Sequence, residues 1–127
     1  MCGRFGIYLI PGLVAQMFRA DYEPDPRIEP TWNLVPSQRT MVVLRDPDTG
    51  DRRLELLQWG VPVALSYGPA AFSPPDNART ETVTSGMFRD AFEKRRCLVP
   101  ADNFYEWKSP TISRNSRMRS LLLTGTR

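Results

Sequence analysis

The stretch MVVLRDPDTGDRRLELLQW, residues 41–59, decides the fold. The apolar run Met41–Leu44 is typical of a strand, and Arg53–Trp59 has the alternating character of a partner strand. Between them, Asp46–Asp51 gathers the Asp, Pro and Gly residues that form tight turns. The stretch therefore predicts an antiparallel β-hairpin.

Two segments carry the apolar spacing of short helices. One is Phe5–Ala20, whose clearest apolar face follows a break at Pro11 and Gly12, and the other is Thr80–Lys94. The connecting segment Asp21–Thr31 is expected to be a loop. Val61–Asp76 contains four of the twelve prolines and a single charge, so it predicts a long irregular stretch.

The end of the chain predicts short strands and a poorly packed tail. Cys97–Val99 is a short apolar strand ended by Pro100, and Asn103–Lys108 is a compact aromatic segment. Ser109–Arg127 is rich in Ser, Thr and Arg and has no aromatic residue, so we expect it to pack poorly. The expected fold class is α+β, β-rich, with antiparallel strands and short helices.

The bulk composition limits the class of protein. A chain of 127 residues has the size of one small domain, and no apolar run approaches the ~20 residues of a membrane span. No signal-peptide pattern is present, so a cytoplasmic location is expected. The chain has no histidine, which excludes a Ser-His-Asp triad, a Cys-His pair and histidine-ligated zinc within it. No metal or cofactor is expected, and the sequence indicates no oligomeric state.

Charge is distributed unevenly along the chain. The whole chain has 17 basic and 14 acidic residues, but four arginines and no acid fall in residues 109–127. Residues 1–108 therefore carry 13 basic residues against 14 acidic ones. Nucleic-acid binding must consequently be argued from particular arginines and not from the overall charge.

Cys2 is the residue with the most distinctive chemistry. Removal of Met1, which a small second residue permits, would leave an α-amine and a thiol on neighbouring carbon atoms. The amine titrates near ~8 and the thiol near ~8.5, so some neutral amine is available at pH 7. The amine can attack an aldehyde to form an imine, and the thiol can close on that imine to form a thiazolidine. By position alone, a cysteine at residue 2 is more often incidental.

Five blocks, in order, give Cys2 a context. They are Met1-Cys2-Gly3-Arg4-Phe5, Trp32-Asn33-Leu34-Val35-Pro36, Trp59-Gly60, Asn77-Ala78-Arg79-Thr80-Glu81-Thr82, and Arg95 to Trp107 with its Phe104-Tyr105-Glu106-Trp107 ending. Together, over residues 1–108, these blocks resemble the SOS-response-associated peptidase (SRAP) family of abasic-site processing proteins. The combination of an N-terminal Cys-Gly-Arg with a downstream Phe-Tyr-Glu-Trp is highly specific.

The resemblance implies a β-rich domain with a positively charged cleft. It further implies that Cys2, after self-processing of Met1, forms a thiazolidine crosslink with the aldehyde of an abasic site in single-stranded DNA. An associated lyase activity is also implied. Carried over residue by residue, Asn77 positions the N-terminus and the sugar, and Glu106 is the acid/base.

These roles have physical support and plainer alternatives. A carboxylic acid among aromatic residues can have a raised pKa, as suits the proton transfers of imine formation, and Glu106 lies between Tyr105 and Trp107. The alternative for Glu106 is a strand residue that faces solvent. The alternative for Asn77 is a turn residue after Pro74-Pro75-Asp76.

Guanidinium groups suit bidentate binding of phosphate oxygens. The expected DNA contacts are Arg4, Asn33, Arg79 and Arg89, with Arg95 and Arg96 more typical of a solvated charge run. Asn33 is equally consistent with a turn before Pro36. Cys97 is expected to be a buried, unreactive core thiol.

The sequence also departs from the family pattern. The second tryptophan expected after Trp59-Gly60 is absent, and Tyr67 is a doubtful substitute; the family histidine is absent as well. We therefore expect residues 1–108 to form a partial SRAP-like domain, incomplete at the C-terminus, and 109–127 to be an anomalous basic tail. A frameshift origin is the hypothesis for the tail, and for Val61–Asp76.

Two other functions compete with crosslinking. One is an inactive remnant or a weak, non-catalytic DNA-binding module. The other is a cysteine peptidase acting on other proteins, which lacks a histidine base. For the crosslinking function, the sequence does not predict whether the chain is an active enzyme, because the segment that carries the family histidine is missing.

Overall fold

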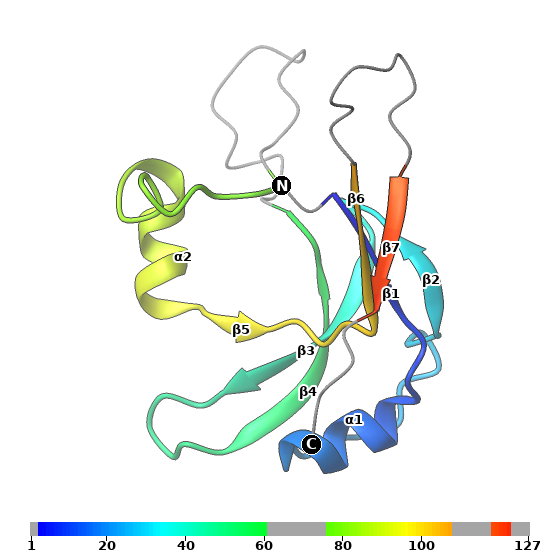
Figure 1. The fold of residues 1–127 in the computed structure, drawn as a ribbon. Coiled ribbons are helices and arrows are strands. Elements are labelled where there is room, and N and C mark those ends of the chain that lie inside the picture. The colour runs from blue at the N-terminus through cyan, green and yellow to red at the C-terminus, as the bar shows by residue number, and fades with distance from the viewer. Residues whose placement is uncertain (1–2, 61–75, 108–117, 123–127) are drawn as a thin grey trace.

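The computed structural model describes residues 3–60, 76–107 and 118–122, and in this part of the chain the strands form two antiparallel sheets (Figure 1). The larger sheet has the order β2-β1-β6-β7, and the smaller has the order β4-β3-β5. The strands of the larger sheet are β1 (Arg4–Ile7), β2 (Thr31–Leu34), β6 (Asn103–Trp107) and β7 (Met118–Leu122). The expected α+β, β-rich class with antiparallel strands and short helices is confirmed.

The smaller sheet is built on the predicted hairpin. Strands β3 (Arg39–Arg45) and β4 (Arg52–Gln58) pair along their whole length, from Arg39 opposite Gln58 to Arg45 opposite Arg52. The Asp46 carboxylate accepts hydrogen bonds from the backbone N–H groups of Asp48 (2.9 Å) and Thr49 (3.0 Å) in the connecting turn. The third strand, β5 (Cys97–Leu98), pairs with β3 and confirms the predicted short strand.

The N-terminal segment is strand and then helix. β1 pairs with a strand on each side and its residues Phe5, Gly6 and Ile7 are all buried, so the first part of the predicted helical segment is a strand. Helix α1 (Pro11–Phe18) begins with proline at its first position, which is compatible with helix geometry, and buries Val14. A helix across all of Phe5–Ala20 is therefore wrong, and a helix after the Pro11-Gly12 break is right.

The second predicted helix is shorter than expected. Only the short 3-10 helix η2 (Gly86–Phe88) and α2 (Arg89–Lys94) are helical, and Thr82 N–H donates to the Arg79 carbonyl in a preceding turn. Gly86 has a positive φ of 62°, which breaks the helical path. The β-branched run Thr82-Val83-Thr84 also disfavours a longer helix.

Besides β1, the larger sheet contains two further strands that the sequence did not predict. The segment 21–31 was expected to be a loop, but β2 begins at its last residue. The expected tail contributes β7, which pairs with β6 from Met118 opposite Trp107 to Leu122 opposite Asn103. Residues 118–122 of the expected tail therefore form a strand of the larger sheet. The expected irregular stretch lies outside the described residues except for Asp76.

The core lies where β1, β2 and the hairpin meet α1. Its most deeply buried large side chains are Ile7, Val14 and Met41. Phe5 packs at its edge on Trp59, with 5.1 Å between ring centroids. Since Phe5 and Ile7 anchor β1 in this core, the N-terminal end of the strand has a defined position.

Among the described residues, neither helix is long and apolar enough to cross a membrane.

Candidate functional site

The N-terminal end of β1 lies directly beside the Phe-Tyr-Glu-Trp motif of β6. Arg4 is opposite Tyr105 and Phe5 is opposite Phe104 in this antiparallel pair. Cys2 itself lies outside the described residues. In the sequence, Cys2 comes two positions before Arg4, the first residue of β1. Strand pairing thus brings together two motifs that are far apart in the sequence.

A β-bulge sets the exposed face of this region. Phe5 is opposite Leu34 and Ile7 is opposite Thr31, so both Trp32 and Asn33 face the single residue Gly6. In a regular strand, neighbouring side chains point to opposite faces of the sheet, and a bulge changes these directions. Asn33 consequently accepts a hydrogen bond from Arg4 through its Oδ1 atom, at 3.2 Å from Arg4 Nη1. Two of the predicted DNA contacts are therefore neighbours.

Trp32 forms an aromatic platform beside this pair. Its ring stacks on Tyr8 with a centroid distance of 4.1 Å and an interplanar angle of 21°. Its backbone carbonyl accepts a 2.9 Å hydrogen bond from the Tyr105 hydroxyl. Trp32 is nevertheless 64% exposed. Trp32 belongs to one of the five sequence blocks, but the sequence gives it no role, because no sequence pattern predicts the bulge.

Glu106 belongs to the other face of the sheet. Neighbouring residues of a strand point to opposite faces, so Glu106 shares the side of Phe104, which packs against the core, and not the side of Tyr105. Glu106 is half-buried. Arg4, which is opposite Tyr105, therefore lies on one face of the sheet and Glu106 lies on the other.

Asn77 is held near the Phe5 side of β1. The Trp59 indole N–H donates to the carbonyl of Asp76 at 3.0 Å, and the Trp59 ring packs on Phe5. The backbone immediately before Asn77 is thus tied to the aromatic pair at the edge of the core. Asn77 is itself half-buried.

Comparisons with known proteins identify the family. The model of the family described as SOS response associated peptidase (SRAP) matches residues 1–121. The chain belongs to the SRAP family. The match extends across most of the segment that we expected to be an unrelated tail.

Several curated relatives of this SRAP chain carry the name abasic site processing protein. YoaM of Bacillus subtilis is 34% identical over 110 residues, which cover 85% of this chain and 48% of the relative. YedK of Escherichia coli is 32% identical over 117 residues, with the same two coverages of 85% and 48%. HMCES of Xenopus tropicalis is 30% identical over 99 residues, or 65% of this chain and 28% of the relative. The chain thus spans about half the length of its bacterial relatives, and no solved structure matches it.

The remaining predicted contacts of the SRAP chain lie on the helical segment. Arg79 is exposed in the turn before η2, and Arg89 of α2 forms a 3.1 Å ion pair with Glu93. Both partners of that pair are largely exposed, so the pair is weak and leaves Arg89 able to exchange partners. Figure 1 shows α2 on the side of β5, away from the β1–β6 pair. The structure therefore joins Arg4 with Asn33 and keeps Arg89 on a separate element.

Cys97 differs from its predicted role. Its side chain is exposed on β5, so the prediction of a buried core thiol is wrong. Both residues of β5 are exposed, because this two-residue strand lies at the edge of the smaller sheet. Partial desolvation by neighbouring groups still raises the pKa of the Cys97 thiol, which lowers the fraction of reactive thiolate. Cys97 is therefore accessible but weakly nucleophilic.

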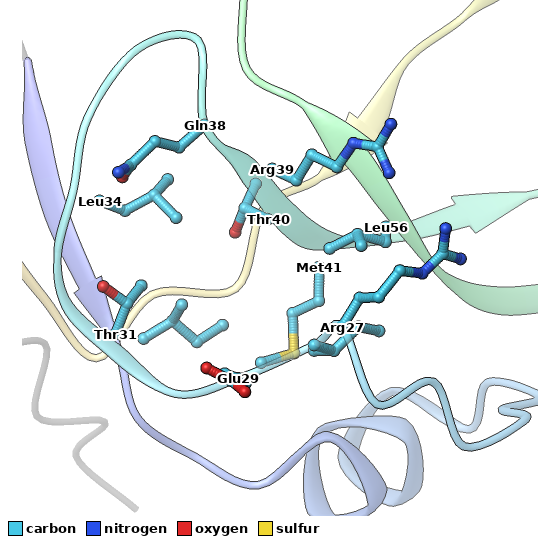
Figure 2. Close-up of a pocket in the computed structure, with 11 residues that line it drawn as sticks. Arg27, Glu29, Thr31, Leu34, Gln38, Arg39, Thr40, Met41 and Leu56 are labelled. Atoms are coloured by element: carbon cyan, nitrogen blue, oxygen red, sulfur yellow. The ribbon is translucent and has the colours of Figure 1, made fainter.

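Two pockets lie apart from the predicted site residues. One, of about 270 Å³, is lined by side chains that include Arg27, Glu29 and Met41 (Figure 2). The other, of about 610 Å³, is almost entirely apolar and lies between Phe5, Leu57 and Val99. Neither is lined by Arg4, Asn33, Asn77, Arg79, Arg89 or Glu106.

In the part of the chain that is described, no group of three or more His, Cys, Asp or Glu side chains could hold a metal ion.

Proposed function

We propose that this SRAP chain processes abasic sites in single-stranded DNA by attaching Cys2 covalently to the exposed sugar aldehyde. The observation that carries the proposal is the pairing of β1 with β6, which places Arg4 opposite Tyr105, the residue before Glu106. The names of YoaM, YedK and HMCES as abasic site processing proteins support the same reaction. The Arg4–Asn33 pair adds polar groups suited to a phosphate backbone.

The proposed chemistry is a condensation without a change in oxidation state. Removal of Met1 by hydrolysis frees the α-amine of Cys2. This amine adds to the aldehyde carbon of the ring-opened sugar, and loss of one water leaves an imine. The thiol sulfur then adds to the imine carbon, and its proton passes to the nitrogen, which closes a five-membered thiazolidine. One water leaves overall, and new C–N and C–S bonds join protein and DNA.

Three residues have distinct roles in this proposal. Cys2 supplies both nucleophiles. Glu106 donates the proton that lets the hydroxyl leave as water and accepts the proton from the amine. Asn77 positions the α-amine and the sugar, while Arg4, Asn33, Arg79 and Arg89 contact phosphates. A lyase step at the same aldehyde would use the same imine.

Denaturing gel electrophoresis tests the proposal directly. Purified protein is incubated with single-stranded DNA that carries one abasic site, and intact mass establishes whether Met1 is removed. We expect a heat-stable, slowly migrating band from the wild type and none from Cys2→Ala. Glu106→Gln should form the band at least tenfold more slowly, because general acid–base catalysis contributes at least that much.

Matched DNA and protein controls make the result specific. An oligonucleotide with a tetrahydrofuran in place of the abasic sugar has no aldehyde and should give no band. Cys97→Ala should crosslink like the wild type, because the nitrogen of an internal cysteine is an amide and Cys97 cannot close a thiazolidine. A folded protein that has lost Met1 and gives no band would instead indicate a non-catalytic DNA-binding remnant.

A further inference from the structure

We propose that Trp32 is a base-stacking subsite for the strand that carries the abasic nucleotide. The inference rests on the proposed function, since it assigns a residue that holds the same DNA. The occupant is an undamaged nucleobase within a few nucleotides of the crosslinked sugar.

The exposure of Trp32 is the first observation. The Trp32 side chain is 64% exposed, so much of its apolar surface lies in water. Phe5 on the neighbouring strand β1 is, by contrast, buried in the core. An unused flat surface of this size is suited to a planar ligand. Every nucleobase has such a face, and base stacking on aromatic residues is the usual way in which proteins hold single strands.

The rigidity of Trp32 is the second observation. Tyr8 supports the ring from one side by stacking at 4.1 Å, and the Tyr105 hydroxyl holds the backbone carbonyl at 2.9 Å. Tyr8 is fixed in turn, because its backbone N–H donates to the Asp102 carboxylate at 2.8 Å. A ring that is already ordered loses little conformational entropy when a base stacks on it.

The placement of Trp32 beside Arg4 is the third observation. Trp32 and Asn33 are the two consecutive residues of the bulge and both are exposed, and the Asn33 amide oxygen accepts the hydrogen bond from Arg4. A strand that follows this face meets a guanidinium group for its phosphates and an aromatic ring for its bases. This pairing of a cation with a stacking ring distinguishes a nucleic acid from an apolar protein partner.

The geometry also limits which base is bound. Tyr8, which supports the Trp32 ring, comes six residues after Cys2, and six residues of extended chain span roughly 20 Å at ~3.3 Å per residue. With a rise of ~3.4 Å per stacked nucleotide, the base lies within about six nucleotides of the abasic one. The stacked base is therefore expected within about six nucleotides on either side of the abasic nucleotide.

The test measures affinity and crosslinking separately in the 127-residue chain. Equilibrium binding uses single-stranded oligonucleotides with a tetrahydrofuran at the centre, which cannot form the crosslink. Trp32→Ala should weaken binding by about fivefold to a hundredfold, as expected for loss of one stacked base, whereas Trp32→Phe should retain most of the affinity. Met17→Ala is the matched control, because Met17 on α1 is 63% exposed and should leave binding unchanged.

Base omission separates stacking from a purely structural role. Each nucleotide within six of the centre is replaced in turn by one that lacks a base. One omission should weaken the wild type to the level of Trp32→Ala and have no further effect on that variant. Full affinity in a folded Trp32→Ala, or an equal loss with every omission oligonucleotide, would overturn the subsite.

The two proposals fail in different ways. A wild type that crosslinks while Trp32→Ala binds normally overturns the subsite and keeps the crosslinking function. A wild type whose binding depends on Trp32 but which never crosslinks keeps the subsite and overturns the covalent step. Absence of any binding to single-stranded DNA overturns both.

Discussion

At the scale of single residues, Gly6 is the position on which the proposed DNA face depends. The two bulged residues Trp32 and Asn33 lie opposite it, and Asn103 of β6 is its partner on the other side. A Cβ atom at Gly6 would overlap Asn103 Oδ1 and come within 3.2 Å of the Trp32 carbonyl oxygen. The backbone oxygen cannot move away without disturbing the bulge. Gly6 is thus required by close packing between strands.

Gly6→Ala should lower the free energy of unfolding by about 1–3 kcal/mol, the usual cost of overpacking. Chemical denaturation followed by circular dichroism measures this change. Gly12→Ala is the matched control, since a Cβ at Gly12 has no neighbour within 4 Å and alanine favours the helix. Its stability should be unchanged or higher by up to about 1 kcal/mol. Equal losses in both variants would contradict the proposed packing role of Gly6.

At the scale of elements, the loop between α1 and β2 is stabilised by its own ion pair. Arg27 contacts the Asp25 carboxylate at 2.6 Å and also donates its backbone N–H to that group. Hydrogen bonds from the Arg27 side chain, and then from its backbone, lower the pKa of Asp25 from 3.8 to about 2. A carboxyl group with a lowered pKa stabilises the folded state above its ordinary pKa. This contribution is lost as the pH falls from about 4 to about 2.

Arg27→Gln should raise the pKa of Asp25 toward its ordinary value, although the backbone bond remains. The carbon chemical shift of the Asp25 carboxyl group, followed by NMR during an acid titration, measures this pKa. The variant should also lose less stability than the wild type between pH 4 and pH 2. Arg39→Gln is the control, because Arg39 acts on Asp25 only as a more distant charge and should shift the pKa less.

At the scale of the whole molecule, the net charge of +3 does not reveal how the groups that would bind DNA in the proposed function are arranged. Two expected phosphate contacts, Arg4 and Asn33, meet at the end of β1, whereas Arg89 lies on α2 beside Glu93. Binding to phosphates releases counterions, so affinity falls as salt rises. The contribution of each arginine can therefore be read from the salt dependence of binding.

Arg4→Gln should reduce the slope of log affinity against log salt by about 0.7, the value expected for one lost contact to a single strand. Fluorescence anisotropy with a tetrahydrofuran oligonucleotide at several salt concentrations measures the slope. Arg45→Gln removes the same charge from an exposed position at the turn end of β3 and should leave the slope unchanged. A similar decrease in both variants would mean that only net charge matters.

Local patterns predicted the elements whose contacts are local. The hairpin of residues 39–58 follows from its turn residues and alternation, and α1 follows from Pro11 and the apolar spacing after it. The motifs around Cys2, Asn77 and Glu106 likewise indicated the SRAP family, which the family match over residues 1–121 confirms. Their individual roles stay predictions. The hairpin, α1 and the family motifs can each be recognised from residues that are close together in the sequence.

Only the tertiary structure decided how the site is assembled. The pairing of β1 with β6, the bulge at the exposed residues Trp32 and Asn33, and the exposure of Cys97 all depend on which distant segments meet. A strand of four residues has too little sequence to specify its neighbours, and its pairing is determined by packing of both partners on the common core. The sequence by itself therefore determined the hairpin, the first helix and the family. Non-local packing determined which of the motif residues stand side by side.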